Sequence, residues 1–118
     1  MSIQSFRDLL VWQKAMLLVT EVYSLSHNFP REELYGLTSQ IRRATVSVPS
    51  NIAEGHQRGT KEFLHFLKIA KGSLAEMDTQ LEIAFRLNYL QETQQKNLQN
   101  QIIEIQKMLS GLMSKLNS

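Results

Sequence analysis

A repeating apolar pattern between residues 63 and 84 constrains the fold of this chain more than any other feature. Its members recur with alternating spacings of four and three residues: Phe63, Leu67, Ala70, Leu74, Met77, Leu81 and Ala84. This heptad spacing places them along one stripe of an α-helix that packs against other helices, and it excludes a strand. Thr60, a residue type that favours helix N-termini, precedes the pattern, and Asn88 interrupts it. We therefore expect a helix from Thr60 to the LNYL segment.

Two other segments show the same periodicity. Near the C-terminus the spacing again alternates between four and three: Leu98, Ile102, Ile105, Leu109, Leu112 and Leu116. Near the N-terminus two apolar rows run side by side: Leu9, Trp12, Met16, Val19 and Tyr23, and then Val11, Ala15, Leu18, Val22 and Leu25. Ser5 and Asp8 predict a capping box at the start of this helix, and Pro30 is expected to end it. The double row predicts an apolar face wider than one neighbouring helix would cover.

A fourth helix is predicted after Pro30. Its apolar row consists of Leu34, Leu37, Ile41, Ala44, Val48 and Ile52. Glu32 and Glu33 suit the positive end of a helix, and the two glycines of EGHQRG, Gly55 and Gly59, are expected to end it.

Two polar features accompany that helix. Pro49 removes a backbone hydrogen bond inside it, and we expect the Asn51 amide to satisfy the groups that are left free. A polar ridge follows the face opposite the apolar row: Arg43, Ser47, Ser50 and Glu54. The small serines would allow a second helix to approach closely.

Four amphipathic helices joined by short connections predict an all-α, antiparallel up-down-up-down four-helix bundle. With 118 residues the chain is expected to form a single domain over residues 1–118. The absence of cysteine excludes a disulfide scaffold, a thiol nucleophile and a zinc ribbon. No apolar run approaches the roughly 20 residues that a membrane span needs, and the first residues lack the features of a signal peptide. We expect a cytoplasmic protein.

The sequence does not suggest a catalytic centre. Bundle di-iron sites use two Glu-x-x-His pairs, and this chain has one, Glu62 and His65, which helical geometry turns away from the apolar stripe. No glycine-rich phosphate loop follows a strand. We therefore expect a protein that is not an enzyme, with no catalytic residues, no cofactor and no metal.

Positive charge is concentrated in one part of the chain. The net charge is +2, yet residues 42–71 hold six basic and two acidic residues, a local net charge of +4. Residues 107–118 add two lysines and no carboxylate. The candidate phosphate-binding residues are Arg42, Arg43, Arg58, Lys61, Lys68 and Lys71. The alternative is an ordinary solvated surface with local ion pairs to Glu54 and Glu62.

Gly72 predicts a contact between subunits. It lies in the middle of a helix, where it costs about 1 kcal/mol relative to alanine, on the face opposite the apolar stripe. Glu76 and the apolar Ile83 share that face. A close neighbouring helix would explain both residues, so we expect Gly72, Glu76 and Ile83 at an oligomer interface. The alternative is a neutral glycine on an exposed face.

Three strings carry a family resemblance: YGLTSQIRRA at residues 35–44, SVPSNIAEG at 47–55 and AKGSLAE at 70–76. Together with FRDLLVWQKA at residues 6–15, they resemble the bacterial four-helix-bundle family of 23S rRNA intervening-sequence proteins. The resemblance covers nearly the whole chain and is weakest in the last helix. A related branch comprises accessory proteins of diversity-generating retroelements, which form pentameric barrels with basic surfaces, bind nucleic acid and associate with a reverse transcriptase.

This resemblance implies a homopentamer and a role with nucleic acid, but it supplies no catalytic residues. We therefore expect a non-enzymatic, oligomeric accessory protein that binds RNA or DNA phosphates through its basic surface. The alternative is a protein-interaction scaffold, such as an adaptor for a polymerase-like partner such as a reverse transcriptase, that makes no nucleic-acid contact of its own.

Overall fold

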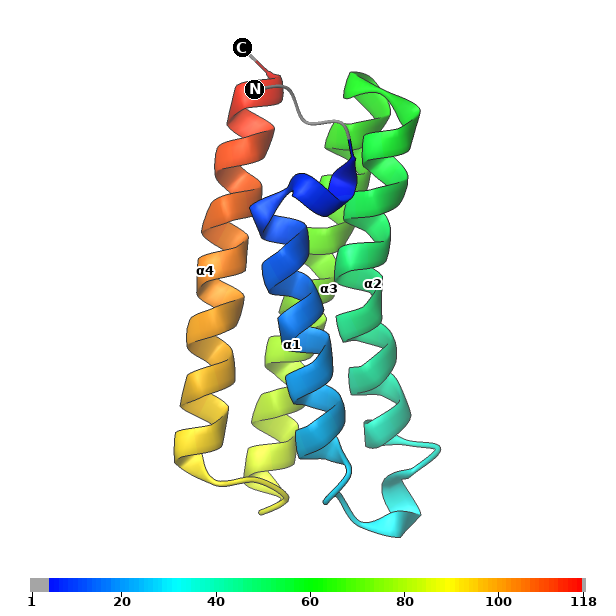
Figure 1. Cartoon of the computed structure of the whole chain (residues 1–118). Coiled ribbons are helices and arrows are strands. Elements are labelled where there is room, and N and C mark those ends of the chain that lie inside the picture. The colour runs from blue at the N-terminus through cyan, green and yellow to red at the C-terminus, as the bar shows by residue number, and fades with distance from the viewer. Residues whose placement is uncertain (1–4, 118) are drawn as a thin grey trace.

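A computed structural model describes residues 5–117 of the chain. It contains four long helices, α1 (Leu10–Ser26), α2 (Leu37–Arg58), α3 (Thr60–Arg86) and α4 (Glu92–Leu116), and two short 3-10 turns, Phe6–Asp8 and Arg31–Glu33. No strand occurs in this part of the chain, so the prediction of an all-α fold with four helices is confirmed. Successive helices run in opposite directions in Figure 1, within a body of 44 × 24 × 21 Å.

Most members of the predicted apolar stripes form the core, but Leu34, expected in the row of the second helix, precedes α2 and is 46% exposed. All seven members of the α3 pattern are buried, and so are Leu98, Ile102, Ile105 and Leu109 of α4. On α1 only the row from Val11 to Val22 is fully buried, whereas Met16 and Tyr23 of the other row are 39% and 42% exposed. The wide face of α1 is therefore only partly covered by residues 5–117.

Helices α2 and α3 approach each other closely at Gly55. A Cβ at this glycine would lie 2.7 Å from the Cβ of Phe66 and 3.2 Å from the Cα of Phe63. Further along the same seam, Ser73 Oγ donates a hydrogen bond to Ser47 Oγ at 2.9 Å. The helix that approaches the Ser47 ridge is thus α3 of the same chain. The prediction that Gly55 ends α2 was wrong, because α2 continues to Arg58 and needs this glycine for close packing.

Helix starts differ from the sequence expectations in three places. The Ser5–Asp8 capping box is present, but it caps the 3-10 turn, and extended backbone at Leu9 delays α1 to Leu10. Likewise α2 begins at Leu37 rather than directly after Pro30, with Glu33 Oε1 accepting a hydrogen bond from the Leu37 backbone N–H at 3.1 Å. The N-cap of α3 is Gly59, whose φ of 111° suits glycine, and not Thr60.

The role expected for Asn51 was also wrong. Its Nδ2 donates to the Ser47 carbonyl oxygen at 2.7 Å and to Ser47 Oγ at 2.8 Å. Pro49 deprives a different carbonyl of its helical partner, that of Thr45, four residues earlier. The asparagine therefore reinforces the Ser47–Ser73 contact with α3 instead of repairing the helix at the proline.

Candidate nucleic-acid interface

The six basic residues expected to bind phosphates lie on different surfaces of the fold. Arg42 faces α1: its Nε donates to Ser26 Oγ at 2.9 Å, and its guanidinium lies 4.6 Å from the centre of the Tyr23 ring. A second nitrogen donates to the Tyr23 carbonyl oxygen at 3.4 Å. The positive charge thus sits at the C-terminal end of α1, where the helix dipole favours a cation. Arg42 is used to join α1 to α2.

The other two arginines also differ from each other. Arg58 forms an ion pair with Glu54 at 2.7 Å and lies over the Phe66 ring, with 5.2 Å from the guanidinium carbon to the ring centre. This is one of the two local ion pairs that the alternative interpretation expected. Arg43 is exposed on the side of α2 that borders α3, and it forms no ion pair with any residue between 5 and 117.

The lysines gather where the first half of α3 faces the second half of α4. Lys71 reaches across to α4, where its Nζ donates to Ser110 Oγ at 3.0 Å. Lys68 lies three residues before Lys71, and Lys107 lies three residues before Ser110. Residues three apart share a helix face, so both lysines flank this contact. Lys61 lies two helical turns before Lys68. We call Lys61, Lys68, Lys71 and Lys107 the lysine cluster.

Carboxylates are absent from the two segments that carry most of this cluster. Residues 63–75 of α3 and 105–117 of α4 contain no aspartate or glutamate. Glu104, directly before the second segment, forms an ion pair with Lys14 of α1 at 2.6 Å. The positive potential of the cluster is therefore uncompensated by carboxylates of these two segments, as an anion-binding surface requires.

Sequence reasoning found Lys61, Lys68 and Lys71 but did not include Lys107. The available signal was the pair of lysines without carboxylates in residues 107–118. Nothing local connects that segment to residues 61–71, because the contact depends on the antiparallel packing of α3 against α4.

The opposite half of the α3–α4 surface is acidic. Glu82 accepts hydrogen bonds from Arg86 Nε and from Gln95 Nε2, both at 2.8 Å. The bond from Arg86, followed by that from Gln95, holds the pKa of Glu82 below its ordinary value. Asp78 accepts a hydrogen bond from Gln99 at 3.1 Å. This surface therefore has one basic half and one acidic half.

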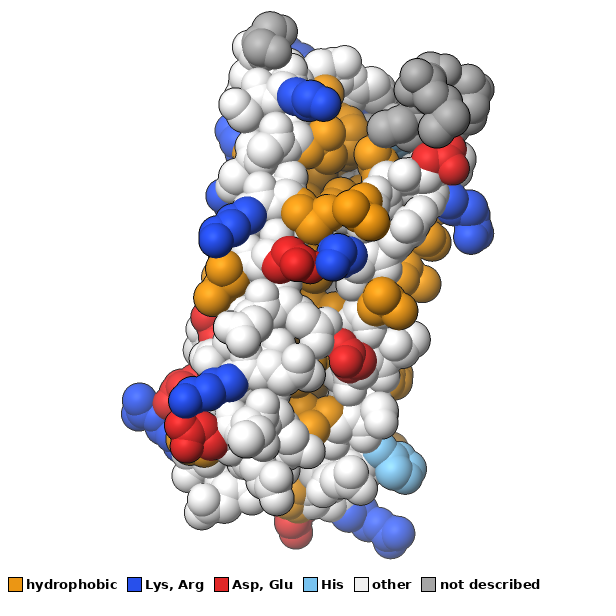
Figure 2. Space-filling model, turned by 60° about the vertical axis from the view of Figure 1, so that its left-hand side comes forward, with side chains coloured by type: hydrophobic (Ala, Val, Ile, Leu, Met, Phe, Trp, Pro, Cys, Tyr) orange, Lys and Arg blue, Asp and Glu red, His pale blue; other side chains and the backbone are white. Residues whose placement is uncertain are grey.

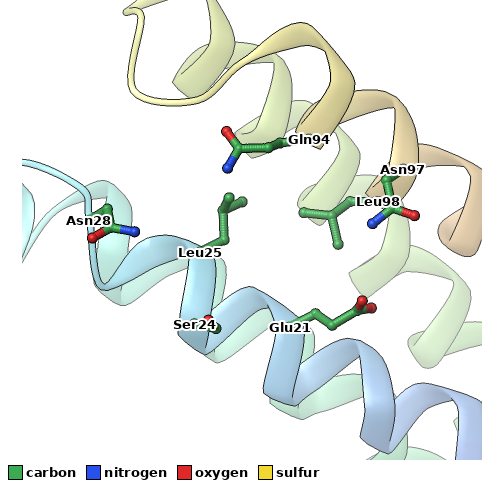
Figure 3. A pocket seen from close by; sticks show the side chains of 7 residues that line it. All are labelled: Glu21, Ser24, Leu25, Asn28, Gln94, Asn97 and Leu98. Atoms are coloured by element: carbon green, nitrogen blue, oxygen red, sulfur yellow. The ribbon is translucent and has the colours of Figure 1, made fainter.

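The surface formed by α1 and α4 is of a different kind. Figure 2 shows hydrophobic side chains along the middle of this side of the molecule. On α1, Leu10 is 57% exposed and Leu17 is 64% exposed. Near the far end of α1, a hollow of about 290 Å³ places Leu25 and Leu98 between polar side chains that include Asn28 and Gln94 (Figure 3). These features suit contacts with protein rather than with phosphate.

The three residues expected at an oligomer interface are divided between two surfaces. Gly72 is exposed, and apart from its own helix no heavy atom of residues 5–117 lies within 4 Å of the place that a Cβ would take. Ile83 is 43% exposed and lines a hollow that extends toward α4. Glu76 lines a groove on the other side of α3, between α3 and α2.

The remaining sequence candidates were Glu62 and His65, which are both exposed. The His65 ring lies 5.4 Å from that of Phe66. Within residues 5–117, no group of three or more His, Cys, Asp or Glu side chains is arranged to hold a metal ion. No helix in this range combines the length and apolarity that crossing a membrane would require.

The fold and this surface define a class: small all-α proteins of four long helices with a basic region on the outside. The chain belongs to the 23S rRNA-intervening sequence protein family, whose model matches residues 7–111. The resemblance seen in the sequence is thereby confirmed. A search of curated proteins found no match.

A solved structure resembles this protein over most of the chain. It is a protein with unknown function from the S23 ribosomal protein family of Bacteroides thetaiotaomicron VPI-5482. The TM-score is 0.81 at 25% sequence identity, and the match covers 88% of this chain and 95% of that chain.

Proposed function

We propose that this protein is a non-enzymatic nucleic-acid-binding protein whose lysine cluster holds phosphate groups. The observation that carries the proposal is the pair of facing segments, 63–75 and 105–117, which contribute lysines and no carboxylates to one surface. The family is named for an intervening sequence of 23S rRNA, which makes RNA the first ligand to test.

Lysine binds phosphate as a point charge, without the planar geometry that reads base edges. Binding by the cluster is therefore expected to depend little on sequence and strongly on salt. Each phosphate contact contributes about −0.7 to the slope of log K against log salt concentration for single strands and about −0.9 for duplexes. Four lysines predict a slope of about −3 for single strands.

The test measures the affinity of labelled RNA and DNA over a range of salt concentrations. Lys107→Gln should make the slope less steep by about 0.7 to 0.9, because it removes one contact. Lys96→Gln is the matched control: it makes the same change on the same helix, but Lys96 lies at the other end and pairs with Glu92 at 3.0 Å. It should leave the slope unchanged. Absence of binding at low salt by the folded protein would refute the proposed function.

We further propose that the protein forms a homo-oligomer, a pentamer as the family resemblance implies. Gly72 and Ile83 of one subunit would lie against a different surface of the next, which is the heterologous contact that a ring requires. The exposed Leu10 and Leu17 of α1 provide apolar area for that second surface.

The same leucines support the alternative function, a scaffold for a polymerase-like protein partner. The two functions differ in one measurement, because the scaffold alone would bind no nucleic acid at any salt concentration. Lys107→Gln would then change neither partner binding nor assembly.

A further inference from the structure

A polar groove of about 600 Å³ runs between α2 and α3, away from the lysine cluster. Its floor is made of small side chains, those of Ala44, Ser47 and Ser73, and the 2.9 Å hydrogen bond between the two serines closes it. Small residues at this position leave room for a ligand to approach the two helices. The volume lies within the range of about 300 to 1,000 Å³ that is usual for small-molecule sites.

The two walls of the groove carry complementary chemistry. On the α2 wall, Arg43 offers guanidinium donors and has no ion-pair partner among the described residues. On the α3 wall, Glu76 offers a carboxylate, and Gln80 Oε1 is a buried acceptor to which no described group donates. An acceptor that is buried without a donor loses free energy, and because Gln80 Oε1 is shielded from solvent, its side chain must turn toward the groove before a ligand N–H can satisfy it. The groove therefore suits a ligand with an anionic group on one side and N–H donors on the other.

An aromatic side chain stands beside these polar groups. Tyr35 lines the groove two residues before α2 and is 94% exposed, so nothing in the described chain covers its ring. Exposed aromatic rings next to cationic groups are the usual stacking platforms for unpaired bases. Tyr35 and Arg43 both line this groove, so the aromatic platform and the cation belong to one site.

We propose that this groove binds one unpaired nucleotide whose base carries an exocyclic amino group. The base stacks on Tyr35, the amino group donates to Glu76 and Gln80 Oε1, and the phosphate binds Arg43. The proposal rests on the proposed function, because it adds a base-dependent site to a protein that otherwise holds phosphates without base readout. It also explains why Arg43 lies apart from the lysine cluster.

The first experiment uses single nucleotides, which are too small to bridge the groove and the cluster. Titration with CMP, followed by NMR of the Gln80 side-chain amide and of the Ser47 and Ser73 backbone amides, should give saturable shifts. UMP, cytidine and ribose 5-phosphate each lack one required group and should bind at least about fivefold more weakly. Equal binding of UMP and CMP, or shifts confined to the lysine cluster, would overturn the proposal.

Variants then test the stacking and the phosphate contact. Tyr35→Ala should weaken CMP binding about 5- to 100-fold, whereas Tyr35→Phe keeps the ring and should bind as the wild type does. Arg43→Gln should abolish the difference between CMP and cytidine. Unchanged CMP affinity in Tyr35→Ala would show that the base does not stack there.

Single-stranded oligonucleotides separate this proposal from the proposed function. The wild type should prefer oligo(C) to oligo(U), and Tyr35→Ala should remove the preference without changing the salt slope. Lys107→Gln should change the slope and keep the preference. If all oligonucleotides bind equally well, the groove proposal fails and the lysine cluster stands. If none binds at low salt, the proposed function fails, and the CMP titration alone decides whether the groove is a nucleotide site.

Discussion

Replacing Gly55 by alanine tests the close approach of α2 and α3. In an open helix this change would stabilise the protein by about 1 kcal/mol, since alanine is the better helix former. Here the added Cβ would lie 2.7 Å from Phe66 Cβ, 3.0 Å from Phe63 Cδ1 and 3.2 Å from Phe63 Cα. Carbon atoms pack best at about 3.5 to 4.0 Å, so α3 must move away by about 1 Å. Two of the three contacts are with Cα or Cβ atoms, which no side-chain rotation can relieve.

Overpacking of this kind costs about 1 to 3 kcal/mol, and the backbone contacts place this case in the upper part of that range. After the gain in helix propensity, we expect Gly55→Ala to lower the free energy of unfolding by about 1 to 2 kcal/mol. The assay is urea denaturation followed by circular dichroism, with the midpoint compared at equal m-values. Thermal unfolding should show a decrease in Tm of about 4 to 8 °C.

Gly111→Ala is the matched control, because Gly111 lies within α4 and, apart from that helix, no described atom lies within 4 Å of its added Cβ. This variant should be more stable than the wild type by up to about 1 kcal/mol. If Gly55→Ala is as stable as the wild type, or gains as much as Gly111→Ala, the claim of a tight α2–α3 contact is wrong.

Three further predictions follow from other contacts. Arg42→Gln should lower the free energy of unfolding by about 1 to 2 kcal/mol in denaturation experiments, because Ser26, which is 2% exposed, loses its charged partner. The same variant should not change the salt slope of RNA binding. A changed slope would show that Arg42 contacts phosphate. The lowered pKa of Glu82 contributes stability that is present above the ordinary glutamate range and is lost as pH falls through the lowered pKa. The difference in the free energy of unfolding between the wild type and Arg86→Gln should therefore shrink below about pH 4. A difference that stays constant there would contradict the role assigned to Arg86. Gly72→Leu should break the oligomer in sedimentation experiments while helicity is kept, and an unchanged assembly would exclude Gly72 from a tight interface.

The sequence alone determined the four helices and most of their buried faces. The spacing of Phe63, Leu67 and Ala70 is a relation among residues within one or two turns, and local geometry converts it directly into a stripe. The same is true of Ile102, Ile105 and Leu109, and all six of these side chains are buried. The ends of the helices were less predictable. The N-cap of α3 is Gly59 rather than Thr60, because the backbone there has a positive φ, and residue types indicate such a conformation only in part.

The tertiary structure decided which charged residues share a surface. Arg42 and Arg43 are adjacent in sequence, yet one is bound to Ser26 of α1 and the other lines the α2–α3 groove. Lys71 and Lys107 are far apart in sequence and lie on one surface, because Lys71 reaches Ser110 across the α3–α4 contact. Helical periodicity fixes which side of its own helix a residue occupies. Its neighbours on other helices depend on which helices are adjacent and on their relative register, and these follow from the packing of whole helices.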